Sequence, residues 1–362
     1  MADIGILTFQ NTLNFGASLQ CYALYNVIQQ MGFDVQVINY NNPIIATREF
    51  LVPDRGLKSV IKVMLNKPKA RKFEAFLHRM NVSPSCDKSN FKEIANQYDG
   101  IVVGSDQVWN PECTGYDTTY FLDLVDSPIV KLSYAASIGL NHFPDCGIDY
   151  GALLGQFSSL LVREKTASEE ISRYVDKPIN IVLDPTLLLS LDSWKNIVQI
   201  PRSVRGKRYV LVYSISESEL SLRAARRIAK EKNLEIVFIQ QYKFNRVKDA
   251  INMRNISPEE FVGLFLGADV AVVSSFHGLC FSIISGTDFL YASDSGKSSR
   301  ASRLLDLMTL LGIERRSVSD YFNGEMIPLN WDQVFSKLDN ERIRSRNALT
   351  NSLGLVRSSQ AN

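Results

Sequence analysis

Short apolar runs alternate with stretches of helical periodicity along most of this chain. Residues 3–9 and 33–40 have the composition of strands, and between them the apolar positions of residues 19–28 recur with helical spacing up to Gly32. A strand, a helix and a strand in this order predict a parallel, right-handed unit. The first forty residues therefore predict the start of a Rossmann-like half.

The same alternation continues to about residue 183, stops, and then restarts. The additional strands expected before the break lie at residues 100–103, 130–135, 159–162 and 179–183. Pro201, Gly206 and several charges interrupt the pattern across residues 189–207. Beyond the break, strands are expected at residues 209–213, 234–239 and 271–274, and helices at residues 220–232 and 258–267. This pattern predicts an α/β fold of two facing Rossmann-like domains with the active site in the interdomain cleft.

The break places the domain boundaries. We expect an N-terminal Rossmann-like domain at residues 1–190, a C-terminal Rossmann-like domain at 207–315, and a helical extension with a polar, frayed tail at 316–362. Residues 58–72 carry many positive charges and are expected to form a surface helix or a lid.

Composition limits the partners of the chain. Its 362 residues are 45% apolar, enough for two cores, and 40 basic against 38 acidic side chains give no reason to expect a nucleic-acid partner. Five scattered cysteines without a CxxC pair argue against a disulfide framework and against a metal site. No apolar run approaches ~18 residues, so we expect a cytoplasmic protein with at most peripheral association with the inner face of the membrane.

Two polar groups that follow predicted strands are typical of sugar recognition. Asn14 stands beside Gly16 at the start of the first helix, where it is a candidate sugar ligand or a simple N-cap. Asp106, Gln107 and Trp109 combine a carboxylate, an amide and an indole in one loop. In that loop a helix cap by Asp106 and a core position for Trp109 are the alternatives.

Two further groups are typical of anion binding and proton transfer. Arg163 follows a predicted strand and could hold a phosphate or a carboxylate, or form a salt bridge with Glu164. His277 is one of three histidines and the one placed between a buried strand and a helix, so a catalytic role competes with that of a structural histidine.

Three cations gather before the amphipathic helix at residues 304–311. Lys297, Arg300 and Arg303 stand where the helix dipole disfavours positive charge, so an anionic partner explains them, although a solvated face is the alternative. The spacing matches neither a Walker motif nor a dinucleotide fingerprint.

In these segments the sequence resembles the polysaccharide pyruvyl transferase family, in the family's order from about residue 4 to about residue 312. The pieces that carry the resemblance include Asn14-Phe-Gly-Ala-Ser-Leu-Gln20, Asp99-Gly-Ile-Val-Val-Gly-Ser-Asp-Gln-Val-Trp-Asn110, Ser133-Tyr-Ala-Ala-Ser137, Val162-Arg-Glu164, Leu183-Asp-Pro-Thr186 and Ser274-Ser-Phe-His-Gly278. The resemblance implies a GT-B-like fold and phosphoenolpyruvate as co-substrate, with no cofactor and no metal.

The resemblance also implies roles for single residues. His277 matches the family's catalytic histidine, Arg163 an arginine that helps to hold the donor, and Lys297 loosely matches a donor-binding lysine. Many members carry an arginine where this chain has Ser275, so Arg300 or Arg303 is expected to supply that contact. On this view Asn14, Asp106, Gln107 and Trp109 bind the acceptor from the first domain.

The function implied is transfer of the pyruvyl group of phosphoenolpyruvate to a sugar hydroxyl pair, forming a pyruvate ketal and releasing phosphate. The acceptor is expected to be a surface-polysaccharide precursor or a lipid-linked saccharide. The alternatives are a GT-B glycosyltransferase that uses a nucleotide sugar and a catalytically silent glycan-binding protein of the same fold.

Overall fold

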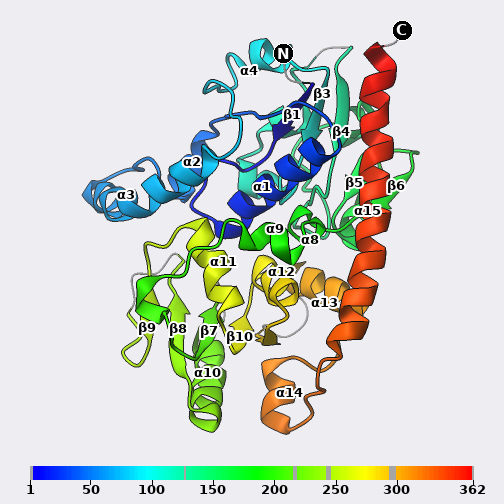
Figure 1. The fold of residues 1–362 in the computed structure, drawn as a ribbon. Helices are drawn as coiled ribbons and strands as arrows, with labels where there is room; N and C mark the ends of the chain where they lie inside the picture. The colour runs from blue at the N-terminus through cyan, green and yellow to red at the C-terminus, as the bar shows by residue number, and fades with distance from the viewer. Residues whose placement is uncertain (1–2, 126–127, 215–217, 242–245, 293–298, 361–362) are drawn as a thin grey trace. The chain divides into compact units, whose positions relative to one another are not determined.

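The computed structural model describes residues 3–125, 128–214, 218–241, 246–292 and 299–360. The chain divides into two compact units, and Figure 1 shows the course of the chain through each. Unit 1 comprises Met1–Leu188 together with Glu341–Asn362, and unit 2 comprises Leu189–Asn340. The change of unit at residue 189 coincides with the start of the break in the sequence pattern.

The C-terminal residues do not form the separate extension that was expected at 316–362. One helix, α15 (Trp331–Gln360), contains the boundary, and its second part belongs to unit 1. Two contacts explain this return: the Leu183 backbone N–H donates a hydrogen bond to Ser345 Oγ at 2.9 Å, and Val356 packs against Gly100. The tail that was expected to fray is helical as far as Gln360.

Unit 1 is built on parallel strands. Its main sheet has the order β2-β1-β3-β4, formed by β1 (Ile4–Leu7), β2 (Val35–Val37), β3 (Gly100–Val103) and β4 (Val130–Ser133). The pair β5 (Leu160–Val162) and β6 (Ile179–Ile181) is also parallel and is linked to the end of this sheet by isolated bridges from Leu132 and Ala136. The parallel strand–helix–strand unit predicted for the first forty residues is confirmed.

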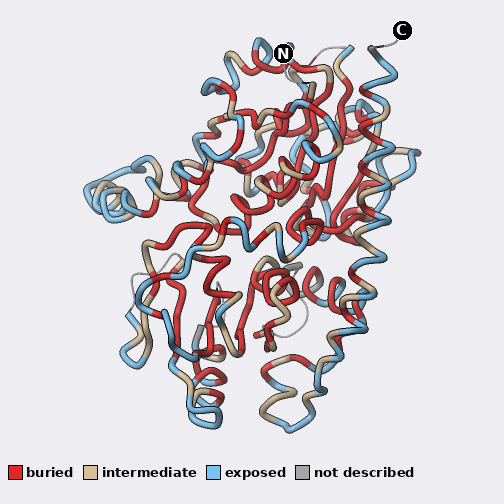
Figure 2. The backbone as a smooth tube through the Cα atoms, viewed as in Figure 1, coloured by how far each residue is buried: buried red, intermediate tan, exposed pale blue. Residues whose placement is uncertain are grey.

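The helices of unit 1 differ strongly in how far they are buried. They are α1 (Phe15–Gln30), α2 (Pro43–Arg48), α3 (Leu57–Leu77), α4 (Phe91–Ala95), α5 (Pro111–Thr114), the 3-10 turn η1 (Thr118–Phe121), α6 (Tyr150–Gly155), α7 (Lys165–Ile171) and α8 (Pro185–Leu188). Figure 2 shows buried positions along the strands and α1, whereas α3 is exposed over most of its length. The helix expected at residues 58–72 is therefore present as a surface helix.

Unit 2 contains one five-stranded parallel sheet with the order β11-β10-β7-β8-β9. Its strands are β7 (Tyr209–Tyr213), β8 (Glu235–Ile239), β9 (Ile251–Met253), β10 (Val270–Val273) and β11 (Asp288–Tyr291). Neither edge strand was predicted. β9 is three residues long with a central asparagine and has no distinct apolar run. β11 does have a short one, but it begins only three residues after the apolar helix α12 and was not separated from it.

The helices of unit 2 bury an aromatic cluster against the central strand β7. They are α9 (Leu191–Lys195), the 3-10 turn η2 (Arg202–Val204), α10 (Ser218–Lys232), α11 (Pro258–Leu266), α12 (Phe276–Ser285), α13 (Ser299–Leu311) and α14 (Val318–Asn323). Phe261 of α11 stands edge-on to Tyr213 of β7 at 4.9 Å and to Phe281 of α12 at 5.7 Å. These aromatic contacts fix the start of α12, directly after β10.

Two glycines in helices provide a matched test of this packing. A Cβ at Gly263 in α11 would overlap the backbone carbonyl oxygen of Gln199, whereas a Cβ at Gly354 in α15 would meet no atom within 4 Å. We expect Gly263→Ala to destabilise the protein by roughly 1–3 kcal/mol through overpacking. Gly354→Ala should stabilise it by roughly 0.5–1 kcal/mol, because alanine loses less backbone entropy in a helix.

Urea unfolding followed by circular dichroism measures both effects. A stability loss in Gly354→Ala, or none in Gly263→Ala, would contradict the packing described.

Candidate functional site

The carboxyl edge of the unit 2 sheet collects polar side chains. Ser214 follows β7, Gln240 follows β8, and Ser274 follows β10, and all three are buried. Parallel strands bring these positions to one edge, which is where open α/β sheets bind ligands. Ser214 Oγ lies 3.1 Å from Ser274 Oγ and accepts a hydrogen bond from Ser221 at 3.2 Å. The edge therefore carries a cluster of hydroxyl groups.

His277 stands beside this cluster in the first turn of α12. Ser275 is the N-cap of the helix, and its hydroxyl accepts a hydrogen bond from the Gly278 backbone N–H at 2.9 Å. The imidazole is half-buried and lies edge-on to the ring of Phe276, with 5.5 Å between ring centroids. A helix start concentrates backbone N–H groups and partial positive charge, which favours an anionic ligand next to the imidazole.

The space next to Gly278 is filled by neighbouring residues, so this glycine leaves no room for a ligand beside His277. A Cβ there would lie 2.9 Å from Ser275 Oγ, 3.0 Å from Tyr213 and 3.1 Å from Val273. The glycine is needed for close packing of α12 on β7 and β10. Any ligand must therefore approach His277 from another side.

The three cations expected near a donor are only partly described. Arg303 lies on α13, within unit 2, and is buried. Lys297 lies outside the described residues, as does the side chain of Arg300.

Arg163 is held inside unit 1 by carboxylates. Its guanidinium lies 3.2 Å from Asp184, 3.4 Å from Glu164 and 3.7 Å from Asp106, and its side chain is 2% exposed. Burial lowers the pKa of Arg163, but the charges of the three carboxylates more than reverse this effect and raise it above the usual arginine value. Ser105 donates a hydrogen bond to Asp184 and Ser137 one to Glu164.

This cluster is a structural ion-pair network. One guanidinium faces three carboxylates, so the local charge repels an anion such as phosphate or carboxylate. Of the two roles that the sequence left open for Arg163, the geometry favours the salt bridge with Glu164 over donor binding.

The loop after β3 contributes to the core more than to a binding surface. Trp109, expected to bind the acceptor, is fully buried: its indole N–H donates to the Tyr120 carbonyl oxygen at 3.0 Å, and its ring stacks on Phe121 at 5.7 Å. The loop turns inward, so the geometry favours the core position that the sequence left as the alternative for Trp109. Gln107 is half-buried and accepts a hydrogen bond from Asn110 at 2.9 Å.

The other two expected acceptor residues also have structural partners. Asp106 belongs to the Arg163 cluster, with its side chain 13% exposed. Asn14 is the N-cap of α1, where its side-chain oxygen accepts a hydrogen bond from the Ala17 backbone N–H at 3.3 Å. This is the capping role that the sequence left as the alternative.

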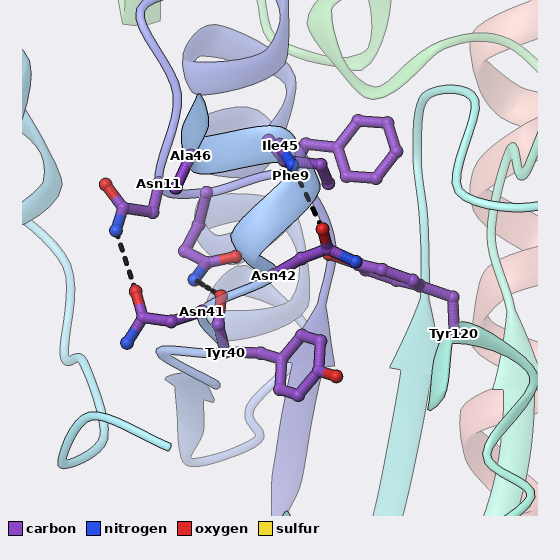
Figure 3. Close-up of a pocket in the computed structure, with 9 residues that line it drawn as sticks. Phe9, Asn11, Tyr40, Asn41, Asn42, Ile45, Ala46 and Tyr120 are labelled. Atoms are coloured by element: carbon purple, nitrogen blue, oxygen red, sulfur yellow. Dashed lines mark hydrogen bonds between the residues drawn. The ribbon is translucent and has the colours of Figure 1, made fainter. Parts of the chain in front are cut away.

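A small pocket does open at the carboxyl edge of the unit 1 sheet, over β1 and β2 (Figure 3). The hollow is shallow: about 10 Å³ of it is enclosed, room for about one water molecule, and the space of about 230 Å³ around it includes open solvent. Two of its wall segments, residues 9–11 and 40–42, follow these neighbouring strands. Its lining is formed by Phe9, Gln10, Asn11, Tyr40, Asn41, Asn42, Ile45, Ala46 and Tyr120. Sequence reasoning missed the pocket, although a polar segment after each of two consecutive strands was a signal for it.

Amides and aromatic rings dominate this pocket. Asn11 donates a hydrogen bond to Asn41 at 2.8 Å, and Gln10 donates one to the Tyr40 carbonyl oxygen at 2.8 Å. Tyr120 stands edge-on to Phe9, with 5.4 Å between the ring centroids. The lining residues carry no formal charge, so the pocket suits a neutral ligand with hydroxyl groups and apolar faces.

A buried ionisable pair supports the loop that carries Asn11. The Glu49 carboxylate accepts hydrogen bonds from Thr12 and Leu13, and Lys69 lies over the ring of Phe15 at 4.5 Å. Burial raises the pKa of Glu49 and lowers the pKa of Lys69 to about 7, while their mutual attraction opposes both shifts. The pair fixes the segment between β1 and α1.

The segments that resemble the pyruvyl transferase family also lie within a match to a model of that family. A sequence model of the polysaccharide pyruvyl transferase family matches residues 14–294. The chain belongs to this family. The match covers both the pocket-lining segment at residues 40–46 of unit 1 and the His277 segment of unit 2. No curated protein sequence matches this pyruvyl transferase family member.

Solved structures confirm the GT-B-like fold of two Rossmann-like domains for this family member. *Staphylococcus aureus* MnaA bound to UDP is 10% identical, with a TM-score of 0.51 over 92% of this chain and 90% of that one. *Anabaena* HepE in complex with UDP and glucose is 10% identical, with a TM-score of 0.50 over 100% of both chains. A putative UDP-N-acetylglucosamine 2-epimerase from *Listeria monocytogenes* is 11% identical, with a TM-score of 0.50 over 96% and 90%. At these identities the likeness concerns the fold alone.

The two roles considered for Arg163 predict different outcomes for one substitution. Arg163→Ala leaves buried carboxylates without their cation, so we expect it to destabilise the protein by roughly 3–5 kcal/mol. Lys165, two residues after Arg163, forms an exposed ion pair with Glu169, and Lys165→Ala should cost only roughly 0.3–0.5 kcal/mol.

Urea unfolding and a binding titration with phosphoenolpyruvate are the measurements. Near-normal stability of Arg163→Ala together with lost binding would assign the arginine to the donor instead.

Proposed function

We propose that this protein transfers the pyruvyl group of phosphoenolpyruvate to two hydroxyl groups of a sugar in a polysaccharide precursor, forming a pyruvate ketal. The observation that carries the proposal is the position of His277, directly after β10 in the first turn of α12, in a chain of the pyruvyl transferase family. There a proton donor stands next to a helix start that favours an anion.

His277 would act as the general acid. Its imidazolium protonates the methylene carbon of phosphoenolpyruvate, which produces a methyl group and an oxocarbenium-like carbon at C2. One sugar hydroxyl attacks C2 and loses its proton, phosphate leaves with the electron pair of the C2–O bond, and the second hydroxyl closes the ketal. The neutral imidazole can accept one of the released protons.

Unit 2 offers O–H and N–H groups that can hydrogen-bond to the anionic phosphoenolpyruvate. The hydroxyl groups of Ser214 and Ser274 and the backbone N–H groups at the start of α12 lie at the same sheet edge as His277. Arg303 of α13 is proposed to contact the phosphoenolpyruvate anion. Lys297 and Arg300 are proposed for the same role. Arg163 is not part of the proposed donor site.

The unit 1 pocket over β1 and β2 is the proposed subsite for a sugar of the acceptor. Its amides can exchange hydrogen bonds with hydroxyl groups, and Phe9 and Tyr120 offer ring edges to the apolar face of a sugar. Its lack of charged lining residues distinguishes it from a site for phosphoenolpyruvate.

Replacement of His277 tests the proton transfer. We expect His277→Gln to lower kcat by about 10² to 10⁴-fold, because general acid catalysis typically contributes that much. The dissociation constant for phosphoenolpyruvate should change little, since the serines and helix N–H groups are proposed to hold the anion. Phosphate release and calorimetric titration, both normalised to folded protein, give the two values.

His142→Gln is the matched control. His142 pairs with Glu170 at 2.8 Å in unit 1, outside the proposed donor site, and its loss should leave kcat unchanged. A kcat of His277→Gln within about threefold of the parent would remove His277 from the mechanism.

Two substitutions test the acceptor subsite. Asn11→Ala and Asn41→Ala each remove an amide from the pocket, and a double variant should raise the acceptor KM by roughly tenfold to a hundredfold, equivalent to one or two lost hydrogen bonds. The KM for phosphoenolpyruvate should stay the same. Asn96→Ala, an exposed asparagine after α4, is the control. A rise confined to the phosphoenolpyruvate KM would reject the acceptor role of this pocket.

A further inference from the structure

The first turns of α3 expose a row of large apolar side chains. Leu57 is 75% exposed, Ile61 45%, Met64 67% and Leu65 45%. Positions separated by three or four residues lie on one face of a helix, so these four side chains form a single apolar stripe, here called the α3 stripe. Large apolar side chains gathered on one exposed helix face mark an interaction surface.

Cations flank the α3 stripe. Between residues 57 and 73 the sequence contains six basic side chains and no Asp or Glu, although the whole chain has a net charge of only +2. At the 3.6-residue period Lys58 and Lys62 lie along one side of the stripe, and Lys67 and Arg71 lie along the other. Four of the six cations, all exposed, therefore border the apolar face.

The C-terminal turns of α3 hold the helix to unit 1. Phe73 packs on Phe15 with 5.2 Å between ring centroids, and Phe76 packs on Tyr22 at 5.3 Å, both against α1. The buried Lys69 lies over the rings of Phe15 and Phe73. The preceding turns extend from the body of unit 1 and are exposed (Figure 1 and Figure 2).

We propose that residues 57–71 of α3 bind the surface of a lipid bilayer that contains anionic lipids. An apolar stripe bordered by lysine and arginine matches a helix lying in the interface, with its apolar face among the acyl chains and its cations at the headgroups. A second copy of this chain is a poor occupant, because it would place the four exposed cations of residues 57–71 against the same four. Among the described residues no helix is long and apolar enough to cross a membrane, so the contact is peripheral.

The proposal does not depend on the reaction that the protein catalyses. It does fit an acceptor carried on a lipid, because a surface-bound enzyme meets such a substrate at the membrane.

Vesicle sedimentation of the full-length protein tests the proposal. The probes are vesicles of phosphatidylcholine alone and vesicles of phosphatidylcholine with phosphatidylglycerol in equal amounts. We expect binding to the anionic vesicles, weak binding to the neutral ones, and release as salt screens the cations. Ile61→Glu/Met64→Glu should lower the partition coefficient on anionic vesicles by at least roughly tenfold, because it removes apolar anchors and adds like charge.

The matched control changes exposed apolar residues elsewhere in unit 1. Ile343 and Leu355 of α15 are 61% and 42% exposed, and Ile343→Glu/Leu355→Glu should bind vesicles like the parent. Thermal unfolding confirms that both double variants fold, and phosphate release with a water-soluble acceptor should be equal in all three proteins.

Three outcomes would overturn the proposal. They are no binding to anionic vesicles at low salt, equal binding by Ile61→Glu/Met64→Glu and the parent, and a concentration-dependent dimer in sedimentation velocity that this double variant abolishes. The last outcome would assign the α3 stripe to a second copy of the chain.

Discussion

The ion-pair network around Arg163 determines what the carboxyl edge of the unit 1 sheet can do. Arg163 and Glu164 follow β5, Asp184 follows β6 and Asp106 lies in the loop after β3, so one guanidinium joins three strand ends. Removing the cation would leave buried carboxylates unpaired, which is why the network is costly to alter. Because three carboxylates face one guanidinium, this part of the edge serves as a scaffold. The pocket over β1 and β2, at the same edge of the sheet, is lined by uncharged residues.

The two units therefore offer different chemistry at equivalent sheet edges. Unit 1 presents amides and aromatic rings, which suit a sugar, and it holds them in place through the capped start of α1 and the buried pair of Glu49 and Lys69. Unit 2 presents hydroxyl groups, a helix start and His277, which suit an anion that must receive a proton. In unit 2, Ser275 supplies the hydroxyl that caps α12 and so positions the turn carrying His277.

The sequence predicted the parallel strands of the unit 1 sheet, the three inner strands of the unit 2 sheet, the break near residue 189 and the position of His277 between a strand and a helix, because buried parallel strands are continuous apolar runs followed by polar turns. It left two roles open where a residue's type does not reveal the direction of its side chain. Trp109 and Arg163 follow strands as ligand-binding residues do, yet both point inward, one to an aromatic core and one to carboxylates. The pocket combines residues from two loops, α2 and η1, a proximity that a local pattern cannot show.

Proton delivery to the donor carbon is the central step of the proposed reaction, and deuterium can report it. In D₂O, with phosphoenolpyruvate and an acceptor glycan, we expect a pyruvate ketal whose methyl group carries one deuterium, with one phosphate released per ketal. Nuclear magnetic resonance of the product and a phosphate assay on the same sample measure both. Glycan modification that proceeds without phosphoenolpyruvate and releases UDP from a nucleotide sugar would contradict the proposed reaction.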